Sequence, residues 1–175
     1  GLIGGRGGNV TITSSAGSIV SNANRFSTPA IRTDGGFANS TTSTAGSGGN
    51  LTMTVNDPTQ TISLFGGYSV TGGGTVGGAA TPGAGGNMTF NGNVLVSGVT
   101  GNMTSVEFQA NGGNNGLADG GHVLFNGTLN ANPLYAAPNF TVTTSRSGQQ
   151  TYAGAVGAVT PLASFTANNV PVNNI

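Results

Sequence analysis

The sequence predicts an all-β fold, a parallel β-helix (β-solenoid) with irregular corner loops. Three observations carry this prediction: short apolar–polar alternation, a glycine- and asparagine-rich corner before many of the alternating runs, and recurrence of the corner-plus-strand unit. No stretch carries an apolar stripe at helical spacing, and 33 glycines in 175 residues oppose helix formation. We expect residues 1–175 to form a single solenoid segment without separate domains.

The clearest repeat is Gly-Gly-Asn followed by an apolar–Thr–apolar triplet. It occupies residues 7–12, 48–53 and 85–90, and looser copies occupy residues 100–105 and 120–125. We expect the glycines to adopt positive φ at a tight corner, and the asparagine to tolerate the left-handed region and bond its own backbone there. The triplet that follows has a period of two, so its apolar side chains share one face of a strand.

Further short runs fit the same alternating pattern, at residues 61–65, 93–96, 106–108, 140–142 and 164–166. Gly, Asn, Ser or Pro lies close to nearly all of them, which is typical of short strands between turns. We expect the alternating apolar side chains to stack into one narrow core. The predicted inward residues are Val10, Ile12, Leu51, Met53, Ile62, Leu64, Met88, Phe90, Val94, Val96, Val106, Phe108, Val123, Phe125, Phe140, Val142, Leu162 and Phe165.

Two architectures fit a chain of many short strands. An antiparallel sandwich has strands of about five to six residues joined by tight hairpins. A solenoid has shorter strands, frequent corners and stacked equivalent residues. The repeat copies recur at spacings that cluster near one or two turns of about 20 residues. We therefore favour a solenoid of about eight to nine coils, in which inserted corner loops make the spacing unequal.

Charge is almost absent from the chain. Four Arg, no Lys and four acidic residues leave a formal net charge of zero. Scattered arginines cannot neutralise a nucleic-acid backbone, so we expect no nucleic-acid partner. No apolar run approaches the ~20 residues of a membrane span, and there is no cysteine for a disulfide or a thiolate metal site. A surface without net charge lacks self-repulsion, which favours association.

Side chains able to carry chemistry are few. Asp119 and His122 are the only acid and imidazole within one turn of each other, and we interpret His122 as the occupant of the asparagine position in a repeat corner. Residues 4–9 have the outline of a calcium-binding nonapeptide, but Asn9 stands where a carboxylate is needed. The same glycines lack the Lys and the helix of a phosphate loop. We predict no catalytic residue, no metal site, no cofactor and no enzymatic activity.

Seven Asn-x-Thr sequons are present, and four of them belong to the repeat itself. They give the candidate glycosylation sites Asn9, Asn39, Asn50, Asn87, Asn102, Asn126 and Asn139. Thr-x-Thr pairs also recur, at residues 11/13, 42/44, 52/54, 59/61 and 141/143. Because their spacing is uneven, we predict solvent-facing strand threonines rather than a long stacked ladder of the kind that binds ice.

The Gly-Gly-Asn-apolar-Thr-apolar repeat resembles the coils of large filamentous-haemagglutinin-type exoproteins of bacteria. Residues 150–169, Gln-Thr-Tyr-Ala-Gly-Ala-Val-Gly-Ala-Val-Thr-Pro-Leu-Ala-Ser-Phe-Thr-Ala-Asn-Asn, are similar to strands that recur in that family. The resemblance covers most of the chain. It implies a right-handed parallel β-helix that is secreted and displayed on the cell surface, and it implies no single activity.

Two functional classes remain. The first is a non-enzymatic structural or adhesive segment of an extracellular fibre, with glycans of host or neighbouring cells as candidate partners. The second is a carbohydrate-binding or carbohydrate-active β-helix, which the dispersed acids and the three separated tyrosines do little to support. Solenoid ends expose strand edges, and we find no sequence typical of a cap at either end. We therefore expect copies to stack end to end as a head-to-tail homopolymer.

Overall fold

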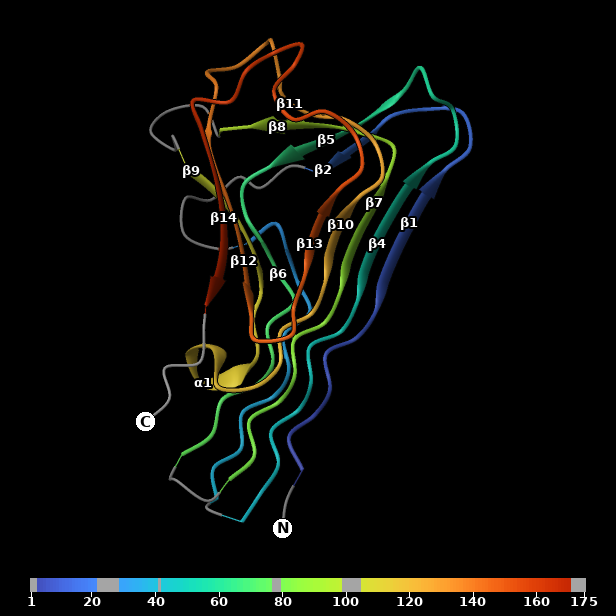
Figure 1. Ribbon diagram of the computed structural model, residues 1–175. Helices are drawn as coiled ribbons and strands as arrows, with labels where there is room; N and C mark the ends of the chain where they lie inside the picture. The colour runs from blue at the N-terminus through green and yellow to red at the C-terminus, as the bar shows by residue number, and fades with distance from the viewer. Residues whose placement is uncertain (1–2, 22–28, 41, 77–79, 99–104, 171–175) are drawn as a thin grey trace.

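The computed structural model describes residues 3–21, 29–40, 42–76, 80–98 and 105–170 (Figure 1). Over these residues the protein is all-β, apart from a single helical turn, α1 (Gly113–Gly116). Its strands form three sheets, and all the strand pairs are parallel. This arrangement excludes a sandwich built from hairpins, because a hairpin joins antiparallel strands.

The chain visits the three sheets in rotation. The first sheet contains β1 (Val10–Ser14), β4 (Leu51–Val55), β7 (Met88–Asn91), β10 (Val123–Phe125) and β13 (Gln150–Tyr152). The second contains β2 (Ile19–Ser21), β5 (Thr61–Phe65), β8 (Asn93–Ser97) and β11 (Leu129–Ala131). The third contains β3 (Ile31–Arg32), β6 (Tyr68–Ser69), β9 (Ser105–Ala110), β12 (Asn139–Ser145) and β14 (Ser164–Val170). We call one passage through the sheets a circuit, and the described chain makes five.

The strand register gives the length of each circuit. Val10 pairs with Leu51, Leu51 with Met88, Met88 with Val123 and Val123 with Gln150, so equivalent positions lie 41, 37, 35 and 27 residues apart. The prediction of about 20 residues per coil and eight to nine coils is therefore wrong. Each of the first four circuits holds three strands and contains one repeat copy rather than two, whereas the fifth holds only β13 and β14.

The repeat copy expected at residues 100–105 does not belong with the others. Residues 100–104 lie outside the described residues, and Ser105 begins β9 of the third sheet, whereas the other copies supply strands of the first sheet. The strand that follows this copy therefore differs from the strands that follow the other four. Counting it as a copy shortened the predicted coil.

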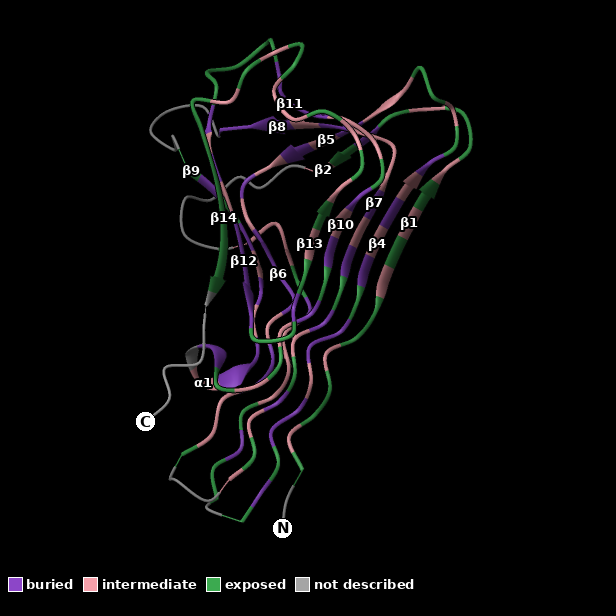
Figure 2. Cartoon of the chain, in the orientation of Figure 1, coloured by how far each residue is buried: buried purple, intermediate pink, exposed green. Residues whose placement is uncertain are grey.

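An apolar core lies between the sheets, and Figure 2 shows that buried residues gather on inner strands such as β4 and β7, whereas the edge strand β14 is largely exposed. Fourteen of the predicted inward residues are buried, while Val10, Ile12 and Leu162 are partly buried and pack against the core. Phe165 also faces the core, where its ring stacks on Phe140 at 6.0 Å and meets Tyr152 edge to face at 5.1 Å, but it is 39% exposed because β14 lies at the edge of the third sheet. Tyr68 and Leu129 are fully buried and were not predicted.

Aromatic rings run through this core from circuit to circuit. Phe90 stacks on Phe125 with ring centroids 4.9 Å apart, and Phe125 stacks on Tyr152 at 5.4 Å. These three residues occupy one register position of the first sheet. Phe108 of the third sheet meets Phe140 edge to face at 4.9 Å. Aromatic pairs at these separations stabilise a core beyond the area that they bury.

Glycine-rich connections run from the third sheet to the first sheet of the next circuit. We call residues 33–38, 70–76 and 110–114 the outgoing layer, and residues 4–9, 44–50, 81–87 and 118–122 the returning layer. In the first circuits the two layers extend away from the sheets as the narrow lower part of the molecule in Figure 1. They carry almost no large apolar side chains, so another kind of interaction must hold them together.

Backbone hydrogen bonds hold the layers together in two directions, one along the returning layer and one between the two layers, each with a period of three residues. The N–H groups of Ala45 and Gly48 donate to the returning layer of the next circuit, each at an N···O distance of 2.9 Å. The N–H groups of Gly46 and Gly49 donate instead to the outgoing layer, at 2.9 and 2.7 Å. Three residues per turn is the period of a polyproline II helix, which has no internal hydrogen bonds and offers its backbone groups to neighbours.

The repeat glycines do not act as left-handed corners, so that expectation is wrong. Within the described residues, φ is positive at Gly66, Gly92, Gly116, Gly157, Asn114 and Arg146, and none of these belongs to a Gly-Gly-Asn unit. The repeat positions require glycine because the backbones of neighbouring circuits approach each other closely there. A Cβ on Gly46 would lie within 3.0 Å of the carbonyl oxygen of Gly5 in the preceding circuit. Collagen excludes side chains from its crowded axis for the same steric reason.

Candidate functional site

The repeat asparagines form a column that links successive circuits. The backbone N–H of Asn50 donates to Asn9 Oδ1 at 2.8 Å, and the N–H of Asn87 donates to Asn50 Oδ1 at 2.9 Å. None of these asparagines has positive φ. The expectation that each would turn a corner and bond its own backbone is therefore wrong. Each side chain instead accepts a hydrogen bond from the equivalent residue of the next circuit.

His122 takes the asparagine position of this column, as predicted. Its backbone N–H donates to Asn87 Oδ1 at 2.7 Å, and its Nδ1 accepts the N–H of Gln149 at 3.1 Å. His122 and Asp119 are both exposed. Nowhere in the described chain do three His, Cys, Asp or Glu side chains gather as metal ligands. The contacts of His122 are thus those of a structural side chain.

The sequon asparagines do not gather into one site. Asn9, Asn50 and Asn87 are exposed and use only the side-chain oxygen in the column, so a glycan on the nitrogen is compatible with their contacts. Asn126 donates Nδ2 to Asn91 Oδ1 at 2.6 Å, so its nitrogen already has a structural partner.

The remaining sequons lie apart from the column. Asn139 Oδ1 accepts the Ser164 hydroxyl at 2.8 Å, which joins β12 to β14. Asn39 is exposed beside the outgoing layer, and Asn102 lies outside the described residues. Glycosylation at these positions stays a prediction.

Threonines pair on the outer face of the first sheet over three strands at most, so no long ladder forms, in agreement with the expectation from their spacing. Thr11 pairs with Thr52 and Thr52 with Thr89, and Thr13 pairs with Thr54. Circuits of unequal length place them in register, because the extra residues lie outside the strands. The ladder is short, since Leu124 follows Thr89 in the next strand. The interpretation of these residues as outward-facing strand threonines is retained.

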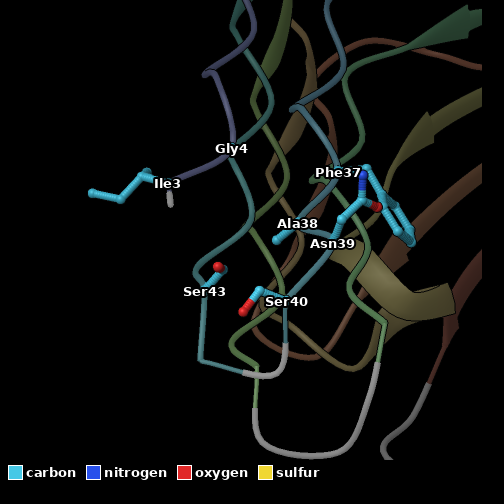
Figure 3. Close-up of a pocket in the computed structure, with 7 residues that line it drawn as sticks. All are labelled: Ile3, Gly4, Phe37, Ala38, Asn39, Ser40 and Ser43. Carbon is cyan, nitrogen blue, oxygen red and sulfur yellow. The ribbon is translucent and has the colours of Figure 1, made fainter. Parts of the chain in front are cut away.

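A small pocket opens where the two layers of the first circuit meet (Figure 3). It has a volume of about 180 Å³ and is lined by Ile3, Gly4, Phe37, Ala38, Asn39, Ser40 and Ser43. The lining contains no acid, base or cation, so it offers no general acid or base. The Ser43 side chain is 3% exposed, and its hydroxyl has no hydrogen-bond partner among the described residues. A buried hydroxyl without a partner is unusual and marks an incomplete environment.

The shifted pKa values also indicate structure rather than catalysis. Burial raises the pKa of Tyr68 and of Tyr152, whose rings pack in the aromatic core. The hydroxyl and the backbone N–H of Thr59 donate to the Asp57 carboxylate and lower its pKa in an exposed turn. None of these three groups lines the pocket.

The two end circuits are the remaining candidate site. Strands β1, β2 and β3 each occupy the edge of their sheet at one end, and β13, β11 and β14 do so at the other. At the first end Ile3 is 78% exposed and Phe37 is 54% exposed, while Val10 and Ile12 are only partly buried. Edge strands with apolar neighbours are templates for pairing with another chain. The sequence predicts exposed ends, but Phe37 could not be foreseen because no alternating strand pattern surrounds it.

No protein-family model, curated protein or solved structure matches this chain. The resemblance of its repeat to filamentous-haemagglutinin-type exoproteins therefore stays a prediction. None of the helices among the described residues is long and apolar enough to cross a membrane.

Proposed function

We propose that this chain is a non-enzymatic extracellular protein with a structural or adhesive role. It would form a right-handed parallel β-solenoid, as a segment or subunit of a cell-surface fibre whose copies stack end to end. The observation that carries the proposal is the presence of edge strands of all three parallel sheets at both ends of the described structure. The right hand, secretion and surface display come from the resemblance of the repeat to bacterial exoproteins.

Stacking of copies needs no new kind of contact. Inside the molecule each circuit already binds the next through parallel ladders and the asparagine column. A head-to-tail contact places one end against the opposite end of another copy, and such a contact generates an open filament when it does not close into a ring. The near absence of charge removes the repulsion that keeps edges apart in many soluble β-proteins.

The alternative, a carbohydrate-active β-helix, receives no specific support from the described residues. Glycoside hydrolysis requires a pair of carboxyl groups that flank the sugar. The pocket lacks any acid, and the acidic residues form no cluster of three with one another or with His122. Binding of cell-surface glycans along the outer faces remains compatible with an adhesive role.

Light scattering at micromolar concentration tests the proposal. We expect the scattered intensity per unit mass to rise with concentration as fibres form. Ile3→Lys places a charge on the exposed first circuit and should shorten the fibres. Thr81→Lys is the matched control, because Thr81 is exposed at the equivalent column position of the third circuit. A monodisperse monomer at all concentrations contradicts the proposal.

A further inference from the structure

A column of five glycines runs through the circuits. Gly8, Gly49, Gly86, Gly121 and Gly148 each lie two residues before the paired positions Val10, Leu51, Met88, Val123 and Gln150 of the first sheet. They therefore occupy one structural position in all five circuits. We call this set the glycine column.

Four members of the glycine column require glycine because of the preceding circuit. A Cβ on Gly49 would lie within 3.0 Å of the carbonyl oxygen of Gly8, and the same holds for Gly86 against Gly49 and for Gly121 against Gly86. A Cβ on Gly148 would lie 2.7 Å from the carbonyl oxygen of Gly121. Each of these glycines lets its circuit approach the backbone of the one before.

Gly8 has no such neighbour. Nothing lies within 4 Å of the position that its Cβ would take, and its φ is not in the left-handed region. Gly5 is equally open, although its equivalent Gly46 is packed against the Gly5 carbonyl. The first circuit thus has the glycines of an interior circuit on a face that no described circuit covers.

A second observation indicates that this circuit is incomplete. The buried Ser43 hydroxyl without a partner lines the pocket beside Gly4, and the exposed Ile3 and Phe37 line the same pocket. In Figure 3 the Ser43 side chain lies beside Ser40 and Ala38, while the Ile3 side chain and the Phe37 ring project to opposite sides. Another layer of backbone on this face would supply both apolar cover and hydrogen-bonding groups.

We infer that a second copy of the chain covers this face, with Gly8 of one copy packed on the carbonyl oxygen of Gly148 of the next. This register rests on the proposed end-to-end stacking. Gly148 is the last member of the column and is buried, and its carbonyl oxygen accepts hydrogen bonds from Thr144 Oγ1 at 3.4 Å and Asn169 Nδ2 at 3.2 Å. The register therefore requires the Asn169 side chain to move aside when Gly8 of the next copy packs on this carbonyl. The register continues the first sheet by placing β1 of one copy beside β13 of the other.

The register also brings two like charges to the junction. Arg6 and Arg146 are exposed, and each lies two residues before its glycine, Gly8 or Gly148. Their repulsion opposes stacking and is screened by salt, so added salt should strengthen association. Arg6→Asp should strengthen association further at low salt, because it places a carboxylate near the guanidinium of Arg146.

Sedimentation velocity of the full chain and of its Gly8→Ala variant tests the register. A methyl group at position 8 has room in one copy but would meet the Gly148 backbone of the next, so the dissociation constant of the association should rise by at least about tenfold. At low concentration, the thermal unfolding midpoint of the Gly8→Ala variant should equal that of the parent chain, because the substitution leaves the single copy unchanged. Gly17→Ala is the matched control, since the nearest atom to its Cβ is the Ser14 hydroxyl at an ordinary 3.6 Å.

The outcomes separate the register from the proposed function. If the parent chain associates and Gly8→Ala associates equally well, the register is wrong while end-to-end stacking survives through another contact. If Gly8→Ala and Gly17→Ala weaken association equally, the effect is not specific to the column and the register is also wrong. If the parent chain does not associate at any concentration, both the register and the proposed stacking fail.

Discussion

The three sheets and the two glycine layers belong to the same circuits but are stabilised by different interactions. The sheets enclose buried aromatic and aliphatic side chains that stack from one circuit to the next. The layers contain little apolar surface and are joined by backbone hydrogen bonds in two directions. In the sheets, truncating a buried side chain should lower the stability of the fold. In the layers, adding a side chain to a glycine should lower it.

This difference separates the two ways in which a short repeat can specify structure. The apolar–Thr–apolar triplet works through what its side chains bury, with a net gain of roughly 1.5–3 kcal/mol for a fully buried large side chain. The Gly-Gly pair works through the absence of side chains, which lets each N–H reach a carbonyl of a neighbouring segment. Adjacent residues in one repeat copy thus serve opposite physical requirements.

Truncation of the core should give the largest loss of stability. Phe108 is fully buried between Tyr68 and Phe140, with ring centroids 4.8 and 4.9 Å away. Phe108→Ala should lower the free energy of unfolding by about 3–5 kcal/mol, measured by denaturant titration. Phe37→Ala removes a half-exposed ring beside the layers and should change it by less than about 1 kcal/mol. Equal losses would contradict the assignment of the core to the sheets.

Replacing a layer glycine by a larger residue should give the second-largest loss of stability. Gly46→Ala places a methyl group against the Gly5 carbonyl and should destabilise the fold by roughly 1–3 kcal/mol. Gly5→Ala is the paired control: its Cβ meets nothing within 4 Å and its φ is not positive. It should be neutral or stabilise by up to about 1 kcal/mol, since alanine restricts the unfolded chain. Thermal melts at dilution measure both, and a harmless Gly46→Ala would contradict the close approach of the layers.

Removing a polar group should raise the stability of the fold in the core between the sheets but lower it in the glycine layers. The Tyr68 hydroxyl is buried in the core, near the Ser21 side chain but without a hydrogen bond of normal geometry to any described residue. Tyr68→Phe removes this unsatisfied group and keeps the ring, so we expect a gain in stability of about 1 kcal/mol. Urea titration would detect the gain as a higher midpoint at an unchanged slope. A loss of stability would show that the hydroxyl has a partner in solution.

The smallest effect should come from the asparagine column. Asn50→Ala removes the acceptor for the Asn87 N–H, and because the site is exposed we expect a loss of about 0.5–1 kcal/mol. Asn50→Asp keeps an acceptor oxygen and should retain most of the stability. Amide hydrogen exchange at Asn87 is the direct measurement, and it should accelerate in Asn50→Ala only. Unchanged exchange in that variant would show that the hydrogen bond contributes nothing.

The sequence predicts much of the sheets because alternation reports burial directly. Leu51 and Met53 flank a threonine, as do Met88 and Phe90, and both members of each pair are buried. The edge position of β14 could not be read from the same pattern, so the partial exposure of the inward-facing Phe165 could not be predicted. Strands as short as β3 and β6 span two residues and carry no period to detect.

The layers could not be predicted for a different reason. Glycine is compatible with positive φ and with close backbone approach, and the residue type alone does not distinguish the two. Gly48 and Gly49 were assigned the first role and have the second. The layers also carry no apolar period. The copies that begin at residues 7, 48, 85 and 120 are spaced by the true circuit length, but the additional copy at residues 100–105 obscured it. The end-circuit site was foreseen only as exposed edges, since the glycine column becomes visible once the register is known.

Electron microscopy of assembled material tests the central claim most directly. Five circuits separated by the ~4.8 Å spacing of parallel strands make one copy about 24 Å long along the stacking axis. If copies stack head to tail with Gly8 on Gly148, fibres should show an axial repeat of about 24 Å, composed of layers about 4.8 Å apart. Isolated particles at all concentrations, or fibres in which the strands of neighbouring copies pair antiparallel, would contradict the account.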